Sequence, residues 1–219
     1  MFDRRAFLML GATSLLGACA GVSGPLGGAT SGPKILYGPK DEKFKVPPVD
    51  LSRIDSQFWR QVVDDPTGEA PGTIVIAPDQ RFLFLVMEGG KARRYGVGVG
   101  REGFLWAGKA TIQRKAKWPT WTPPADMIAR DPRSAQFAHG MPGGPSNPLG
   151  ARAMYLYQGG RDTLYRIHGT NEPYTIGHAM SSGCIRMLDA DVIDLYDRVP
   201  VGTKVVVLPS KGTAIALGS

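Results

Sequence analysis

Short apolar segments bounded by turn residues recur along the middle of the chain. Valine, isoleucine, phenylalanine and leucine dominate residues 73–77 and 81–88, which Pro78-Asp79-Gln80 separates. Apolar runs of this length between turn residues predict β-strands. We expect further strands over 91–100, 107–115, 151–158, 163–168 and 203–208, with hairpin turns at Gly89-Gly90 and Gly159-Gly160.

Helical periodicity is clear only late in the chain. Apolar residues at helical spacing predict a helix over 189–199, capped by Asp189 and ended by Pro200. A short helix is expected over 125–130, and residues 50–65 fit either a strand or a short helix. The alternate glycines of 91–100 predict a strand that another segment approaches closely. The whole pattern predicts a mainly β fold, all-β or α+β, with antiparallel hairpins and a short late helix.

The first 18 residues have the pattern of an export signal. Arg4-Arg5 precedes an apolar run that ends in Leu16-Gly17-Ala18-Cys19. The run is short for a permanent membrane span, and the paired arginines are typical of a twin-arginine signal. Leu-Gly-Ala-Cys is similar to a lipoprotein cleavage box, so we expect Cys19 to become the lipidated first residue of the mature protein. An ordinary signal with a chance cysteine is the alternative.

Composition divides the rest of the chain. Residues 19–48 are rich in Gly, Pro, Ser and Lys and predict a linker, although Phe44 and the apolar residues 35–37 would also suit docking on a domain. We expect an N-terminal extension at 49–70, the main domain at 71–209 and a tail at 210–219. Hydrophobic residues make up 42% and charged residues 21% of the chain, which suits one soluble domain with a buried core.

The charge balance favours an anionic partner. The formal net charge is +7, and removing residues 1–18, with Arg4, Arg5 and Asp3, leaves +6. Nucleic acid is not expected as a partner, because the chain has no run of Lys and Arg and no RNA-type aromatic motif. Export would also keep the protein away from nucleic acid.

The candidate chemistry lies between residues 167 and 187. This stretch contains His168, His178 and Cys184, which are two of the three histidines and one of the two cysteines. A neutral imidazole can deprotonate a thiol to give a nucleophilic thiolate. If Cys19 carries lipid, Cys184 has no disulfide partner in an oxidising compartment, which marks it as a reactive thiol.

Strand geometry adds a neighbour to this thiol. If Cys184 opens a strand, Cys184 and Arg186 face one way, and Ile185 and Met187 face the other. The apolar pair would then anchor the strand to the core while a thiol and a guanidinium share the solvent face.

These residues resemble a known signature. His168-Gly169 followed by Ser181-Ser182-Gly183-Cys184-Ile185-Arg186-Met187 is similar to the pattern of the YkuD-type L,D-transpeptidases of bacterial peptidoglycan. The resemblance extends to residues 143–150 and 201–203 and covers roughly 71–209. Ser182 stands where the family usually has a histidine, and the family's Thr-Pro-x-Gly element is replaced at residues 104–109. The resemblance implies an antiparallel-rich β-sandwich.

The resemblance also implies a reaction and its residues. Cys184 would attack the carbonyl of the diamino acid in a stem tetrapeptide, D-alanine would leave, and the thioester would pass to an amine. His168 would donate and accept the proton, the Gly169 carbonyl would orient its ring, and the backbone N–H groups of Gly183 and Cys184 would bind the oxyanion. Substrate contacts are expected from Arg186, Ser182, His178, Tyr174 and Met180, and no cofactor is expected.

Several alternatives remain open at this point. The acceptor could be a second stem peptide, an outer-membrane lipoprotein, a D-amino acid or water, and water would make the enzyme a hydrolytic carboxypeptidase or an amide-cleaving enzyme. A zinc site from His168, His178 and Cys184 uses acceptable ligands, but no helical pair of ligands supports it. A non-catalytic wall-binding module on a lipid tether is the last alternative. The expected location is the periplasm, with a membrane tether through lipidated Cys19.

Overall fold

Nine strands form one mixed sheet in the computed structural model, which describes residues 34–35, 42–100, 107–179 and 184–210. The order of the strands across the sheet is β10-β9-β8-β7-β11-β4-β5-β6-β3. Among the eight neighbouring pairs of these strands, six are antiparallel, and β10/β9 and β11/β4 are parallel. The predicted mainly β, antiparallel-rich fold is confirmed.

The strand bounds follow the apolar pattern closely. The strands are β3 Gln61–Asp64, β4 Ile74–Ala77, β5 Phe82–Met87, β6 Lys91–Gly96, β7 Gly108–Lys117, β8 Arg152–Gln158, β9 Arg161–His168, β10 Ile185–Arg186 and β11 Lys204–Val207. Separately, β1 Lys34–Ile35 pairs antiparallel with β2 Val49–Asp50. The ambiguous residues 50–65 contain both local structures that we considered, since the 3₁₀ turns η1 Leu51–Arg53 and η2 Ser56–Phe58 precede β3.

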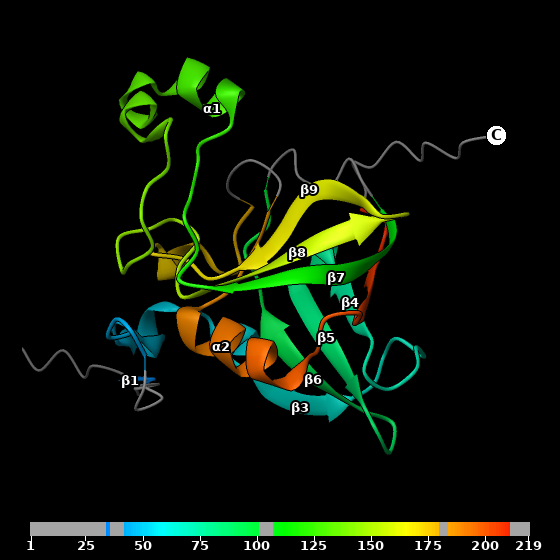
Figure 1. The fold of residues 1–219 in the computed structure, drawn as a ribbon. Coiled ribbons are helices and arrows are strands. Elements are labelled where there is room, and N and C mark those ends of the chain that lie inside the picture. The colour runs from blue at the N-terminus through cyan, green and yellow to red at the C-terminus, as the bar shows by residue number, and fades with distance from the viewer. Residues whose placement is uncertain (1–33, 36–41, 101–106, 180–183, 211–219) are drawn as a thin grey trace, which may run out of the picture. The chain divides into compact units, whose positions relative to one another are not determined.

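The sheet folds back on itself, because the chain directly after β6 pairs with β10. Gly98 and Arg186 exchange both backbone hydrogen bonds, each 2.9 Å long. Figure 1 shows β7, β8 and β9 running across β4, β5 and β6. The inner faces of these strands share one core, which includes Ile76, Leu83, Met154 and Ile167, all fully buried. Burial of this apolar surface is the main force that holds the sheet in its folded-back form.

Two glycines allow the close approach that their spacing predicted. A Cβ atom at Gly96 would lie 2.4 Å from the carbonyl oxygen of Phe58, and one at Gly98 would lie 2.9 Å from that of Thr175. Phe58 of η2 packs with Ile176 and Leu188 in a second apolar cluster. The N-terminal extension therefore lies directly against the segment that precedes Cys184.

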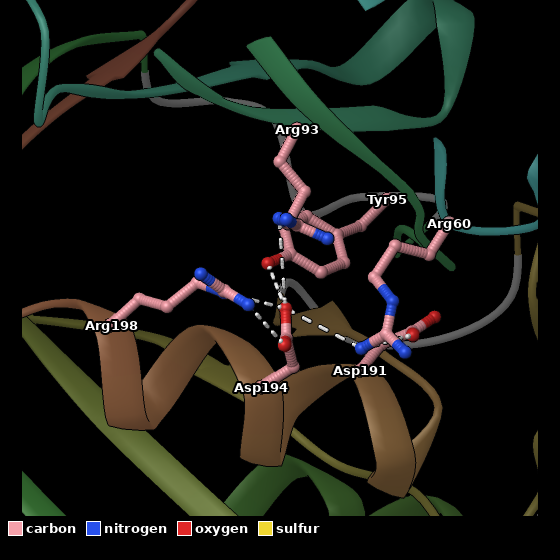
Figure 2. A network of polar contacts seen from close by, with 6 residues as sticks. All are labelled: Arg60, Arg93, Tyr95, Asp191, Asp194 and Arg198. Carbon is pink, nitrogen blue, oxygen red and sulfur yellow. Dashed lines mark hydrogen bonds and ion pairs between the residues drawn. The ribbon is translucent and has the colours of Figure 1, made fainter. Parts of the chain in front are cut away.

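Helix α2, Asp189–Arg198, contributes Val192 and Leu195 to the main core. Its other side carries a buried polar network (Figure 2), in which Asp194 accepts hydrogen bonds from the Tyr95 hydroxyl at 2.7 Å and from Arg198 at 2.9 and 3.0 Å. Arg60 lies 3.4 Å from Asp194 and 3.6 Å from Asp191. The network ties the N-terminal extension and β6 to one face of α2.

The helix does not begin as predicted. Leu188 holds the N-cap position without a side-chain hydrogen bond, and Asp189 is the first helical residue. The Asp189 carboxylate turns away from its own helix and accepts the backbone N–H of Ala151 at 2.8 Å. The prediction of Asp189 as the cap was therefore wrong, because the carboxylate is used in a tertiary contact.

Residues 42–48, assigned to the linker from composition, contact the domain. Glu42 accepts hydrogen bonds from Trp118 Nε1 at 2.6 Å and from the Arg152 guanidinium, whose side chain is 1% exposed. Phe44 packs edge-on against Trp118, with ring centroids 5.1 Å apart, and Val46 is buried. Phe44 therefore docks on the domain, which was the second possibility that the sequence raised for it.

A projecting segment separates β7 from β8. Helix α1, Ala125–Arg130, and the 3₁₀ helix η4, Pro132–Phe137, lie beyond the end of the sheet (Figure 1). The base of the segment is held by the buried Asn147, whose amide nitrogen lies 3.0 to 3.2 Å from the carbonyl oxygens of Pro119, Met141 and Pro142. No helix within the described ranges is long and apolar enough to span a membrane.

Candidate active site

Strand β9 brings His168 to the site. Ile167 points into the core and is fully buried, while Arg166 and His168 lie on the opposite face of the strand. The carbonyl of His168 accepts the backbone N–H of Met187 at 2.8 Å, and the N–H of Gly169 donates to the Arg152 carbonyl at 3.0 Å. Both sides of the histidine backbone are therefore fixed by neighbouring chain segments.

Strand β10 brings Cys184 beside this histidine. The two strands are parallel, with Ile185 opposite Ile167 and Arg186 opposite His168. Ile185 is 1% exposed and lies in the core, so Cys184, the residue before it, lies on the same face as His168 and Arg166. The register places Cys184 opposite Arg166 and diagonal to His168, so the thiol and the imidazole lie on the same face of two neighbouring strands. This is the strand geometry that the sequence predicted for Cys184 and Arg186.

A short hydrogen bond fixes the tautomer of the imidazole. His168 Nδ1 lies 2.6 Å from the Gly169 carbonyl oxygen. Because a carbonyl oxygen only accepts, Nδ1 carries the proton and donates it. The other ring nitrogen, Nε2, is then the unprotonated acceptor that a general base requires. The predicted orienting contact of Gly169 is present in the structure.

Burial favours the neutral forms of both groups. It lowers the pKa of His168 to about 4; the hydrogen bond to Gly169 opposes this shift, and the nearby charges of Arg186 and Arg166 add to it. Burial also raises the pKa of the Cys184 thiol above its usual value, although Arg166 and Arg186 oppose that shift. At neutral pH the pair is a thiol and an imidazole rather than a thiolate and an imidazolium.

Arg166 is a site residue that the sequence reasoning missed. Its backbone N–H forms a hydrogen bond with Cys184, and its positive charge favours the thiolate. Its guanidinium is held by Asp162, with bonds of 2.7 and 2.8 Å, and stacks on Tyr155 at 4.5 Å from the ring centroid. The available signal was its position two residues before His168, which places both residues on one strand face.

The other predicted substrate residues differ in their surroundings. The Arg186 guanidinium lies 3.2 Å from Glu172, which is itself 62% exposed. Tyr174 belongs to η5, Pro173–Thr175, and its ring is covered by the Arg53 guanidinium at 3.6 Å. His178 is exposed, and its backbone carbonyl accepts the N–H of Val99 at 3.2 Å.

Three predicted residues, Met180, Ser182 and Gly183, lie outside the described residues, as does Cys19. Their proposed contacts therefore stay predictions. In the part of the chain that the structure describes, no group of three or more His, Cys, Asp or Glu side chains is arranged to hold a metal ion. Cys184 is a free cysteine there.

Comparison with known proteins gives a consistent family. Residues 71–207 match the model of the L,D-transpeptidase catalytic domain, YkuD. The probable L,D-transpeptidase ErfK/SrfK of Escherichia coli K12 is 36% identical over 155 residues, which are 68% of this chain and 48% of that protein. The probable L,D-transpeptidase YbiS of the same strain is 39% identical over 130 residues, which are 56% of this chain and 40% of that protein.

A solved structure is more similar still in sequence. A protein from Brucella melitensis, described as a probable carnitine operon oxidoreductase caia, is 56% identical, with a TM-score of 0.50. The match covers 73% of this chain and 99% of that one. The chain spans about half the length, or less, of the curated relatives named above. The family model covers most of the chain and includes Cys184 and His168, so the chain belongs to the YkuD family of L,D-transpeptidase catalytic domains.

Proposed function

We propose that the protein is a peptidoglycan L,D-transpeptidase in which Cys184 is the nucleophile and His168 the proton carrier. The observation that carries this proposal is the pairing of β9 with β10, which sets Cys184 and His168 on one strand face with Nδ1 of the imidazole held by Gly169. The family match supports the substrate class, a stem tetrapeptide with D-alanine at its end.

The first half of the reaction forms a thioester. The Cys184 sulfur attacks the carbonyl carbon of the diamino acid as its proton passes to His168 Nε2. Because burial keeps both groups neutral beforehand, proton transfer accompanies the attack instead of preceding it. The tetrahedral intermediate collapses when the C–N bond breaks, and the imidazolium gives its proton to the leaving nitrogen. D-alanine departs with a free amino group.

The second half returns the enzyme to its starting state. An acceptor amine attacks the thioester carbon and gives a proton to His168, a C–N bond forms and the C–S bond breaks. The imidazolium then protonates the departing sulfur. A stem peptide, an outer-membrane lipoprotein or a D-amino acid would each supply such an amine, and water in its place would make the reaction a hydrolysis.

Arg186 is proposed to bind a substrate carboxylate. It lies opposite His168 in the β9–β10 register, and its present partner Glu172 is largely exposed. An exposed ion pair contributes only about 0–1 kcal/mol, so a substrate carboxylate can displace Glu172 at small cost. A guanidinium binds a carboxylate through two parallel hydrogen bonds, which orients the stem as well as attracting it.

The proposed location is the periplasm, with the protein exported by its twin-arginine-like signal and tethered by lipid on Cys19. This proposal is based on the sequence Leu16-Gly17-Ala18-Cys19, which is similar to a lipoprotein cleavage box. A tethered enzyme would act on the wall close to the membrane, and a basic chain suits the carboxylates of the stem peptides.

The test uses purified protein, a stem tetrapeptide and a carbapenem, a class of inhibitor that acylates this family. Mass spectrometry should detect an acyl-enzyme in the wild type and none in Cys184→Ala. His168→Ala should lose at least 100-fold in acylation rate, because it removes the general base, whereas His178→Ala should lose far less. Acylation of Cys184→Ala at the wild-type rate would end the proposal. Products formed with and without an added amine distinguish transfer from hydrolysis.

A further inference from the structure

The carboxylate of Asp189 lies directly behind the His-Gly turn. Its Oδ1 atom accepts the backbone N–H of Ala151 at 2.8 Å, and the carboxylate also accepts the backbone N–H of Thr170. A Cβ atom added at Gly169 would lie 2.0 Å from Oδ1, and one at Gly150 would lie 2.1 Å from it. Asp189 itself is 7% exposed. The carboxylate therefore fills the space that two glycines leave open.

The contact with Thr170 reaches His168 through a single peptide group. The carbonyl of Gly169 and the N–H of Thr170 belong to one planar trans peptide, so they point in opposite directions. The carbonyl end accepts the proton of His168 Nδ1 at 2.6 Å, and the N–H end donates to Asp189. Fixing the N–H end thus fixes the carbonyl end, and with it the plane and tautomer of the imidazole.

We propose that Asp189 is a positioning residue for catalysis, which holds and polarises the Gly169–Thr170 peptide so that its carbonyl orients His168. The arrangement is a Cys-His-Asp series with one peptide group inserted between histidine and aspartate. A charge-assisted hydrogen bond to the N–H draws electron density toward the carbonyl oxygen. That oxygen becomes a better acceptor as positive charge develops on His168 during attack by Cys184.

The charge of Asp189 has identifiable neighbours. Burial raises the pKa of its carboxyl to about 6, while the backbone N–H groups of Ala151 and Thr170 and the charge of Arg152 lower it and the charge of Glu42 raises it. Asp189 also begins α2, whose N-terminus favours a negative charge. Above about pH 6 the carboxylate is ionised at some cost in folding stability, since the unfolded chain ionises more readily.

Because the ionised carboxylate costs folding stability, a role of Asp189 in catalysis can be distinguished from a role in stability. Asp189→Asn removes the charge but keeps a side-chain oxygen that can accept a backbone N–H. At pH 7.5 the substitution should leave the melting temperature unchanged or raise it, because it removes a costly buried charge. If Asp189 positions His168, the same variant should nevertheless acylate at least 10-fold more slowly. If Asp189 served only stability, Asp189→Asn would instead lower the melting temperature and acylate at the wild-type rate.

Asp191→Asn is the matched control. Asp191 lies two residues further along the same helix, and burial raises its pKa to about 7. Its neighbours are Arg60 and Asp194 rather than the His-Gly turn, as Figure 2 shows. Asp191→Asn should acylate within twofold of the wild type. Equal losses in the two variants would overturn the proposal, because they would reflect a general effect of changing α2.

Two further readouts report on Asp189 through the pH dependence of acylation and through the His168 ring proton. In the wild type, the acylation rate should fall as the pH drops below about 6, because protonation of Asp189 weakens its hold on the peptide. Asp191→Asn should keep this fall, and Asp189→Asn should be slow and flat between pH 5 and 8. Protein labelled with ¹⁵N-histidine should show the Nδ1 proton of His168 at low field, moving upfield in Asp189→Asn.

The inference rests on the proposed roles of Cys184 and His168, and the experiments separate the two. If Cys184→Ala is acylated, the proposed function fails. If Cys184→Ala is inactive but Asp189→Asn acylates within twofold of the wild type, with an unchanged His168 signal, only the role of Asp189 is refuted.

Discussion

The buried ion pair between Glu42 and Arg152 gives a direct test of whether residues 42–48 belong to the folded domain. The two side chains are 8% and 1% exposed, and Glu42 also accepts the Trp118 indole N–H at 2.6 Å. Glu42→Gln removes the charge while nearly keeping the volume, and turns an acceptor into a group that also donates. Arg152 is then left as a buried cation without its carboxylate.

Removing one partner of a buried pair costs about 3–5 kcal/mol. We expect the lower part of that range, because Arg152 keeps a hydrogen bond to the Ala151 carbonyl at 2.8 Å and a favourable interaction with the Asp189 charge. The matched control is Glu69→Gln, whose partner Lys204 lies at 2.7 Å with side chains 28% and 43% exposed. An exposed pair of this kind should cost about 1 kcal/mol or less.

Urea unfolding of both variants measures the difference. With a slope near 2 kcal/mol per molar urea, Glu42→Gln should lower the midpoint by about 1.5 M and Glu69→Gln by about 0.5 M or less. Burial alone would raise the pKa of Glu42, but hydrogen bonds from Arg152 and Trp118 bring it below its ordinary value. Its stabilisation is therefore present near neutral pH and lost as the pH falls below about 4, where the variant and wild type should converge. Equal midpoint shifts for the two variants at pH 7.5 would refute the reasoning.

Three further predictions concern the site and the tether. Arg186→Lys should weaken tetrapeptide turnover while leaving alkylation of Cys184 nearly unchanged, and Arg186→Ala should impair both; turnover like the wild type in Arg186→Ala would make Arg186 surface charge only. Because the pKa of His168 is about 4, against about 6.5 in an unfolded chain, this histidine by itself lowers the unfolding free energy by about 3 kcal/mol as the pH falls from 6.5 to 4, whereas the raised pKa values of Asp189 and Asp191 act in the opposite direction. The His168 contribution should appear as the difference between the pH dependence of the wild type and that of His168→Gln. Cys19→Ser should move the protein from the membrane fraction to the soluble periplasm, and unchanged fractionation would show that Cys19 is not the tether.

Local pattern predicted most of the secondary structure because it depends on neighbours in sequence. The apolar runs predicted as strands at 73–77 and 81–88 form β4, Ile74–Ala77, and β5, Phe82–Met87, so no predicted end differs by more than one residue. Helix α1 has the predicted bounds Ala125–Arg130. Residues 42–48 were the weak point of this reasoning. Their composition is that of a linker, and only contacts with Trp118 and Arg152, which are 76 and 110 residues away, make Glu42 part of the fold.

The family, and the proposed nucleophile and base, were readable from the chain itself, because a His-Gly pair and a cysteine followed by Ile-Arg-Met form a local and specific pattern. Strand periodicity further predicted that Cys184 and Arg186 share a face. The tertiary structure decided what surrounds them. Burial made the thiol and imidazole a neutral pair, and the register of β9 and β10 added Arg166 to the site. The start of α2, packed behind the His-Gly turn, turned an expected helix cap into a contact with the peptide that orients His168. Burial, register and such packing depend on residues distant in sequence, so no local pattern could specify them.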